Sequence, residues 1–152
     1  MYMARRIAVR GIIVIDGKLL CFKLQGYNSR TEPTDYWCVP GGGVDDKESL
    51  TAALQREMIE ETGIKPDVGN LLYIQQFKPK HRSGLESLEF FFHIKNSTDY
   101  LHINLDETTH GAQEVAELDF IDASKQLIKP TFLSEVSLNN LDNQPTQIFS
   151  YL

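Results

Sequence analysis

The sequence predicts an α/β fold, an α/β/α sandwich built around a mixed central sheet. Three observations predict it: strand-like runs fall into two groups, one long helical pattern separates the groups, and two shorter helical patterns follow the second group. The resulting order, βββαβββαα, does not alternate strand with helix as a doubly wound parallel sheet does. A chain of 152 residues fits one domain, so we expect residues 1–152 to share a single core.

The first group holds three strands. Residues 7–15 are rich in β-branched side chains, and Asp16-Gly17 separates them from the apolar run 19–22, which is the pattern of a hairpin with a two-residue turn. Residues 25–34 are polar and turn-rich and predict a loop at the rim of a substrate site. The apolar run 36–39 predicts a third strand, which ends at a proline and three glycines.

The long helix and the second group of strands complete the sheet. Helical spacing begins with Asp46 or Ser49 as N-cap and stops at Gly63, a residue type that commonly follows the last helical turn. Apolar and β-branched runs predict three further strands, at 71–77, 88–94 and 114–121. Two short helices are expected at 123–128 and 132–141.

Composition and charge exclude several classes of protein. The chain has 15 Lys and Arg against 21 Asp and Glu, and the net charge of −6 argues against a sequence-independent grip on polymeric nucleic acid. No apolar run approaches the ~20 residues of a membrane-spanning helix, and Arg10 interrupts the N-terminal apolar stretch before it resembles a signal peptide. Cys21 and Cys38 lie in separate strand-like runs without metal-ligand spacing. We therefore expect a cytoplasmic protein with no membrane partner.

One face of the predicted long helix has glutamates at positions where a buried helix face would have apolar residues. Leu50, Leu54, Glu57 and Glu61 follow spacings of four, three and four, which place the last three within about 40° of Leu50 on a helix. With Glu60, three carboxylates crowd the final turns. Like charges at these spacings cost ~0.2 to 0.5 kcal/mol each, and acids in the last turn oppose the helix dipole by a further ~0.3 to 1 kcal/mol.

Two interpretations of this acidic cluster compete. Glu-rich helix ends are commonly solvated faces, and within the helix only Arg56 offers compensation. The other interpretation is a divalent cation, which would turn the repulsion among Glu57, Glu60 and Glu61 into attraction. Oxygen ligands on an open site suit Mg²⁺, with Mn²⁺ as a substitute, better than Zn²⁺.

The glycines before the helix favour the cation. Gly41, Gly42 and Gly43 follow a predicted strand, and backbone groups without side chains can approach a metal or a phosphate closely. From Gly42, five residues lead to Glu48 and seven more to Arg56, after which the chain continues Glu-Met-Ile-Glu-Glu-Thr-Gly-Ile to residue 64. This stretch, residues 42–64, resembles the box of the Nudix hydrolase family at every fixed position.

The resemblance implies a Nudix-type α/β/α sandwich whose box binds Mg²⁺ at a pyrophosphate. In such proteins the glutamates that match Glu57, Glu60 and Glu61 bind one to three metal ions, one of them acts as a base, and the carbonyl that matches Gly41 joins the ligands. The residues expected to support the box structurally are Gly42, Glu48, Arg56 and Gly63, while Met58 and Ile64 are expected in the core.

The expected activity is metal-dependent hydrolysis of a pyrophosphate linkage in a small molecule of the type nucleoside diphosphate linked to X. Water would attack one phosphorus, with charge neutralised by the metal and a proton taken by a carboxylate. One alternative is a non-catalytic Nudix-fold sensor that binds a nucleotide and reports to a partner. Another is an isomerase of isopentenyl diphosphate, which would use a cysteine such as Cys38. The protein is expected to be a monomer or a homodimer.

The substrate itself is not predicted by the box. Pro79 lies fifteen residues beyond Ile64, and a proline at about that distance resembles a mark of ADP-ribose pyrophosphatases, although it also suits an ordinary loop. Side chains that offer base stacking or phosphate contacts, and that equally suit a core or an exposed loop, are Tyr27, Tyr36, Trp37, His81 and Arg82.

A fourth carboxylate often completes such a site, and the candidates are Glu114 and Glu117. If residues 114–121 form a strand, Glu114 shares a face with Leu118 and Phe120, whereas Glu117 shares the other face with Asp119. A buried carboxylate needs a cation or a proton-transfer role to offset its cost, so Glu114 is the preferred candidate. If the strand begins later, Glu114 is a solvated loop residue.

Overall fold

The computed structural model describes residues 4–26, 32–80 and 82–152. Its strands and helices are, in chain order, β1 (Ala4–Ile12), β2 (Val14–Ile15), β3 (Lys18–Leu24), β4 (Gly41–Gly43), α1 (Leu50–Thr62), β5 (Val68–Phe77), β6 (Leu85–Ile94), α2 (Gly111–Glu114), β7 (Val115–Ile121) and β8 (Gln147–Tyr151). Single 3₁₀ segments span Ser97–His102, Leu105–Glu107, Thr131–Ser134 and Leu141–Asn143. The α/β class is confirmed.

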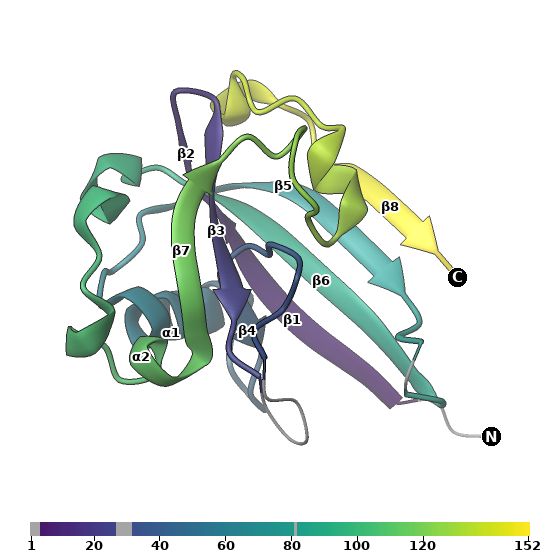
Figure 1. The fold of residues 1–152 in the computed structure, drawn as a ribbon. Coiled ribbons are helices and arrows are strands. Elements are labelled where there is room, and N and C mark those ends of the chain that lie inside the picture. Colours follow the sequence, from purple (N-terminus) through teal and green to yellow (C-terminus); the bar gives the residue numbers. More distant parts are fainter. Residues whose placement is uncertain (1–3, 27–31, 81) are drawn as a thin grey trace.

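The strands form two sheets (Figure 1). The larger has the order β4-β1-β6-β5-β8 and is mixed, because β1 runs parallel to β6 and β5 to β8, whereas β4 and β5 are antiparallel to β1 and β6 respectively. The smaller sheet, β2-β3-β7, is antiparallel. The mixed central sheet predicted from the sequence is thereby confirmed.

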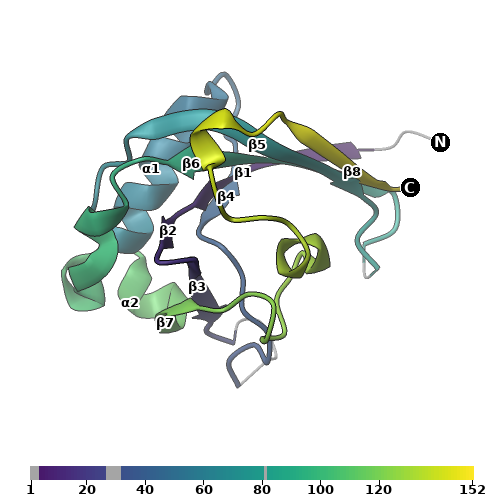
Figure 2. The ribbon, with the colours of Figure 1, turned by 90° about the horizontal axis from the view of Figure 1, so that it is seen from above.

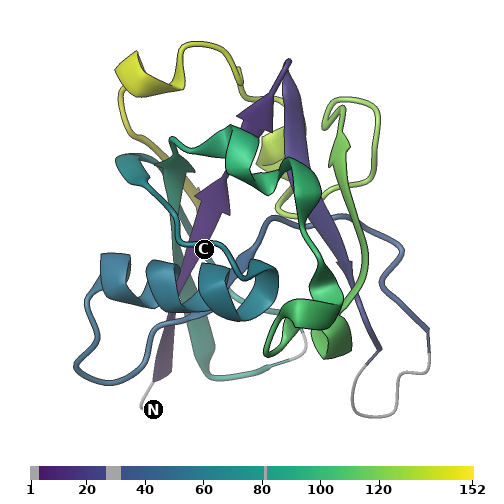
Figure 3. The same cartoon turned by 90° about the vertical axis from the view of Figure 1, so that its left-hand side faces the viewer.

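Helix α1 lies across the strands of the larger sheet, in front of β1 in the view of Figure 3. Ser49 is its N-cap, since the Ser49 hydroxyl accepts a hydrogen bond from the Ala52 N–H at 3.1 Å. Gly63 ends it in the left-handed conformation, with φ of 76°, as predicted. Leu54 and Met58 are fully buried on its inner face, so the apolar half of the stripe anchors the helix to the sheet.

Two apolar clusters hold these layers together. The first, between the sheets and the C-terminal segment, contains Tyr73, Phe91 and Phe132 in edge-to-face contact, as well as Trp37. The second joins α1 to both sheets and includes Met58. Trp37 is 9% exposed, so its role is in the core and it is not a free platform for a base.

The two helices predicted after β7 are wrong. Residues 123–128 form a turn, and 132–141 contain only the end of one 3₁₀ segment, irregular chain, and the first residue of another. This segment instead crosses from the small sheet to the edge of the large one, where β8 pairs with β5 (Figure 2). Serines and asparagines in 132–141 favour turns over helix interiors, and Asn140 adopts a left-handed conformation with φ of 56°.

Two strand boundaries also differ from the prediction. Residues 36–39 make only isolated bridges, at Trp37 and Cys38, and the regular strand is formed by the glycines that follow. β7 begins at Val115, because Glu114 ends the short helix α2. Within the described ranges, none of the helices has the length and apolar character that crossing a bilayer requires.

Candidate active site

The site is built around β4, an edge strand made only of glycine. Gly43 pairs with Ala8, Gly42 with Val9 and Gly41 with Arg10. Gly41 has φ of 141°, and a side chain there would overlap the carbonyl oxygen of Val9. Position 41 therefore requires glycine for its conformation, and the three glycines form a paired strand, not a flexible turn.

Glu57 lies directly against this strand. An added Cβ at Gly42 would be 2.5 Å from the Glu57 carboxyl carbon, so the missing side chain provides the space in which the carboxylate lies. Burial raises the pKa of Glu57, and the hydrogen bond from Arg56 opposes that rise. The carboxylate is thus held at the backbone of β4 by steric space on one side and a cation on the other.

Glu61 is the most buried acid of the cluster, with 6% exposure. Its carboxylate accepts a long hydrogen bond of 3.4 Å from the Gly41 N–H. Burial raises the pKa of Glu61 to about 8; the nearby Arg10 opposes this, and the charges of Glu57 and Glu114 add to it. A carboxyl group that titrates near neutral pH has the property required of a general base.

Arg56 fastens the helix to the loop that precedes it. It donates to both oxygens of Glu48, at 2.8 and 2.9 Å, and to the Gly43 carbonyl at 3.0 Å. It also donates to Glu57 at 3.0 Å and to Glu60 at 3.4 Å. The hydrogen bond from Arg56 lowers the pKa of Glu48 to about 2. The acids are therefore more fully compensated than the sequence indicated, and all the compensation within α1 comes from one guanidinium.

The carboxylates do not converge on one point in this conformation. Among the described residues, no three His, Cys, Asp or Glu side chains are grouped so as to hold a metal ion. Arg56 draws Glu57 and Glu60 toward itself, while Glu61 turns to Gly41. The donor set still has the chemistry that Mg²⁺ requires, because it consists of oxygen atoms beside a strand without side chains.

Sequence reasoning missed a buried ion pair beside the box. Arg10 on β1 donates to Glu89 on β6 at 3.1 Å, and Glu89 is only 6% exposed. Both charges act on Cys38, whose pKa is raised to about 11, chiefly by burial. The Cys38 thiol donates to the Phe22 carbonyl at 3.4 Å and stays protonated, which disfavours its use as a nucleophile. The sequence signal for this ion pair was one charged residue within an apolar run of each strand, Arg10 in β1 and Glu89 in β6.

The candidates for a fourth carboxylate lie in different surroundings. Glu114 is exposed at the end of α2, yet its charge contributes to the raised pKa of Glu61. Glu117 is exposed on β7 and lies 3.8 Å from Lys23. The segment that carries Glu114 is tied to α1, since the His110 N–H donates to the Glu60 carbonyl at 2.9 Å.

The predicted substrate-contact residues are dispersed. Tyr36 packs against the Lys129 ammonium at 4.3 Å, and Pro79 is half-buried in the β5–β6 loop. Arg82 is exposed in the same loop. Tyr27 and His81 lie outside the residues that the structure describes.

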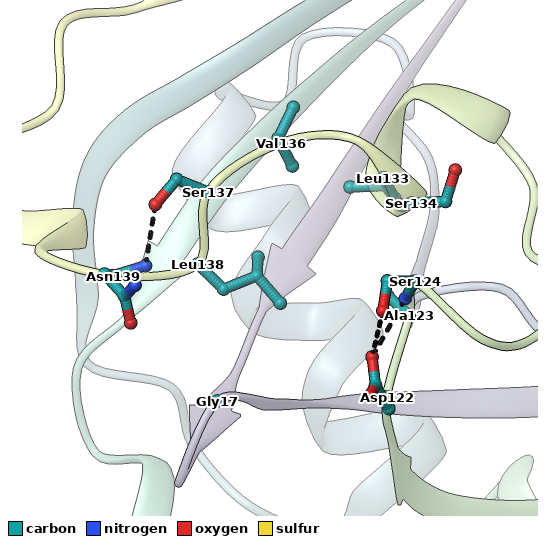
Figure 4. Close-up of a pocket in the computed structure, with 10 residues that line it drawn as sticks. All are labelled: Gly17, Asp122, Ala123, Ser124, Leu133, Ser134, Val136, Ser137, Leu138 and Asn139. Carbon is teal, nitrogen blue, oxygen red and sulfur yellow. Dashed lines mark hydrogen bonds between the residues drawn. The ribbon is translucent and has the colours of Figure 1, made fainter.

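A separate hollow lies beyond the end of β7 and shares no residue with the box (Figure 4). It is lined by Asp122, Ser124 and the segment around Leu133 to Asn139. The Asp122 carboxylate already accepts from both the N–H and the hydroxyl of Ser124. A lining whose one charge is a satisfied carboxylate does not suit a phosphate group.

Comparison with known proteins gives a family match over most of the chain. The NUDIX domain model matches residues 4–134. The human diphosphoinositol polyphosphate phosphohydrolase 3-alpha is 38% identical over 71 residues, which are 42% of this chain and 43% of that protein. The RNA pyrophosphohydrolase of Pasteurella multocida (strain Pm70) is 37% identical over 68 residues, 43% of this chain and 31% of that protein. The match thus spans less than half the length of these curated relatives.

Solved structures share the fold at low sequence identity. The E. coli ORF135 protein aligns with a TM-score of 0.65 and 23% identity, covering 86% of this chain and 85% of that one. A UDP-X diphosphatase aligns with a TM-score of 0.66 and 23% identity, covering 97% of this chain and 68% of that one.

Proposed function

The chain belongs to the NUDIX domain family, and we propose that it is a metal-dependent hydrolase that cleaves a pyrophosphate linkage in a small molecule of the type nucleoside diphosphate linked to X. The observation that carries this proposal is the approach of Glu57 and Glu61 to the glycine strand β4. Two carboxylates beside a strand without side chains supply oxygen ligands where a metal ion or a phosphate can approach the backbone. The relatives named for diphosphoinositol polyphosphates and for RNA support a pyrophosphate as the group attacked.

Each residue of the box has a role in this proposal. Glu57, Glu60 and Glu61, with the Gly41 carbonyl, would hold Mg²⁺ or, in its place, Mn²⁺. A bound divalent cation neutralises phosphate charge and lowers the pKa of a coordinated water. Glu61 is the proposed base, because its buried carboxylate lies at the Gly41 N–H, beside the groups that would hold the metal.

The supporting residues act through these carboxylates. Arg56 and Glu48 fix the loop before α1 against the helix. Glu114 is the proposed fourth acid, because the His110 N–H ties its segment to the Glu60 carbonyl and its charge acts on Glu61. Removal of Arg56 would release Glu57, whereas Glu60 would keep its contact with the His110 ring at 3.1 Å.

A substrate panel tests the proposal. The purified protein is incubated with canonical and oxidised nucleoside triphosphates, ADP-ribose, nucleotide sugars and dinucleoside polyphosphates, in Mg²⁺, in Mn²⁺ and in excess chelator. We expect metal-dependent release of phosphate-containing products from at least one compound, and its loss in Glu61→Gln. Binding without turnover would indicate a sensor, and activity confined to capped RNA would overturn the assignment to small molecules.

A further inference from the structure

The three arginines of β1 differ in their partners. Arg5 pairs with Glu86 at 2.9 Å and Arg10 pairs with Glu89 at 3.1 Å. Among the residues that the structure describes, Arg6 makes no ion pair and no side-chain hydrogen bond, although it is half-buried. A half-buried cation whose donors are unused lowers stability unless it meets an anion.

Arg6 borders the glycine strand of the active site. Side chains alternate along β1, so Arg6 shares a face with Arg10 and lies opposite to Arg5. Its Nη2 atom is 3.8 Å from the position that a Cβ would occupy at Gly43. Burial and the Arg10 charge lower the pKa of Arg6, and the charges of Glu89 and Glu57 oppose this. The Arg6 guanidinium therefore lies beside Gly43, at the edge of the larger sheet that β4 forms.

A second arginine extends the positive charge away from the box. The Ala4 N–H donates to the Gly84 carbonyl at 3.0 Å, which ties the start of β1 to the β5–β6 loop (Figure 1). Arg82 lies in that loop, is exposed, and makes no ion pair within the described part of the chain. The Arg82 carbonyl accepts from the Leu85 N–H at 3.4 Å, and Leu85 pairs with Ala4, so Arg82 lies beside the start of β1. Its charge helps to lower the pKa of Arg6, after burial and Arg10.

We propose that Arg6 and Arg82 form a phosphate track that leads from the box toward the β5–β6 loop, and that the substrate carries three or more consecutive phosphates. The proposal rests on the proposed function, since the box is taken to hold the pyrophosphate that is cleaved. Arg6, beside Gly43, binds one phosphate of that pyrophosphate, and Arg82 binds the next phosphate beyond it. Guanidinium groups suit this role because they bind phosphate oxygens through paired hydrogen bonds.

The track distinguishes two classes of substrate. Nucleoside triphosphates and dinucleoside polyphosphates supply a phosphate for Arg82, whereas ADP-ribose and nucleotide sugars have only the two phosphates of the cleaved linkage. We therefore expect the wild-type protein to prefer the first class in kcat/KM. Loss of Arg82 should remove that preference.

The activity test compares Arg6→Ala, Arg82→Ala and the matched control Arg5→Ala, which lies on the opposite face of β1. With a nucleoside triphosphate, kcat/KM should fall about tenfold or more in Arg6→Ala and Arg82→Ala, as for a lost hydrogen bond to a charged group. With ADP-ribose, Arg82→Ala should stay within about twofold of the wild type, and Arg5→Ala should do so with both substrates. Equal losses on both substrates in Arg82→Ala, or a wild type that prefers ADP-ribose, would overturn the proposal.

A binding test separates this proposal from the proposed function. Inorganic tripolyphosphate should raise the melting temperature of the wild type more than pyrophosphate does, and the difference should disappear in Arg82→Ala. Arg6→Ala without ligand should melt at or above the wild-type temperature, because Arg6 has no ion pair or side-chain hydrogen bond to lose among the described residues. If no compound is hydrolysed but tripolyphosphate binds through Arg82, only the proposed function fails. If compounds are hydrolysed but tripolyphosphate gives no extra stabilisation, only the track fails.

Discussion

Replacing Gly42 with alanine asks whether the Glu57 carboxylate must lie against β4. The new Cβ would be 2.5 Å from the carboxyl carbon of Glu57, whereas carbon atoms in contact are normally ~3.5 to 4.0 Å apart. The carboxylate must then retreat by about 1 Å or more. It lies at the end of a flexible side chain, so we expect the carboxylate to move and the strand to stay in place.

We expect Gly42→Ala to lower kcat/KM and to leave the free energy of unfolding nearly unchanged. Losing the part-exposed contact between Arg56 and Glu57 removes at most about 1 kcal/mol, and alanine in place of a strand glycine returns roughly 0.5 to 1 kcal/mol. The free energy of unfolding should therefore change by less than about 1 kcal/mol, a shift of no more than a few degrees in Tm. Displacing a catalytic group by about 1 Å should lower kcat/KM about 100-fold.

The assay measures kcat/KM at saturating Mg²⁺ together with Tm, on Gly42→Ala and on Gly43→Ala. The second variant is the control, because the nearest atom to its added Cβ is the Arg6 Nη2 at 3.8 Å, an ordinary contact. It should keep most of the wild-type activity. A Gly42→Ala protein that retains kcat/KM within threefold of the wild type at an unchanged Tm would show that Glu57 is not needed at this position.

The remaining predictions concern charge. Glu61→Gln should lower kcat by orders of magnitude. The pKa of Glu61 is about 8 in the folded protein, above its unfolded value, so Glu61 makes the free energy of unfolding fall between about pH 4.5 and 8. Chemical denaturation across that range should show a smaller dependence of this free energy on pH in the variant. Arg56→Ala should lower both activity and Tm, since it frees Glu48 and the Gly43 carbonyl; an unchanged Tm with lost activity would place Arg56 against substrate instead. Glu114→Gln should reduce kcat more than Glu117→Gln at saturating substrate over a pH series, and the reverse order would select Glu117.

The helix and the box were predictable because their signals are local. The Ser49 cap, the left-handed Gly63 and the four-three-four stripe each depend on residues within a few positions of one another. The burial of Leu54 and Glu61 on one face follows from that spacing alone. The family resemblance inferred from the same residues is confirmed by the match over residues 4–134.

The parts that were missed depend on distant partners. β8 is an edge strand whose pairing with β5 joins residues more than seventy positions apart, and glycine has low strand propensity, so β4 is a strand only because β1 supplies its hydrogen bonds. The pairing of Arg10 with Glu89 likewise needs the β1–β6 register. Sequence patterns give the presence of such residues but not their neighbours.

A strand without side chains, such as β4, cannot select between substrates that differ in their leaving group. β4 offers only backbone amide and carbonyl groups to a ligand. These groups can contact the phosphates that every compound in the panel shares. Discrimination must then come from elements outside the box, such as the start of β1 and the β5–β6 loop. Selectivity in this protein should therefore be re-engineered by changing those elements, with Gly41–Gly43 and the helix that follows left untouched.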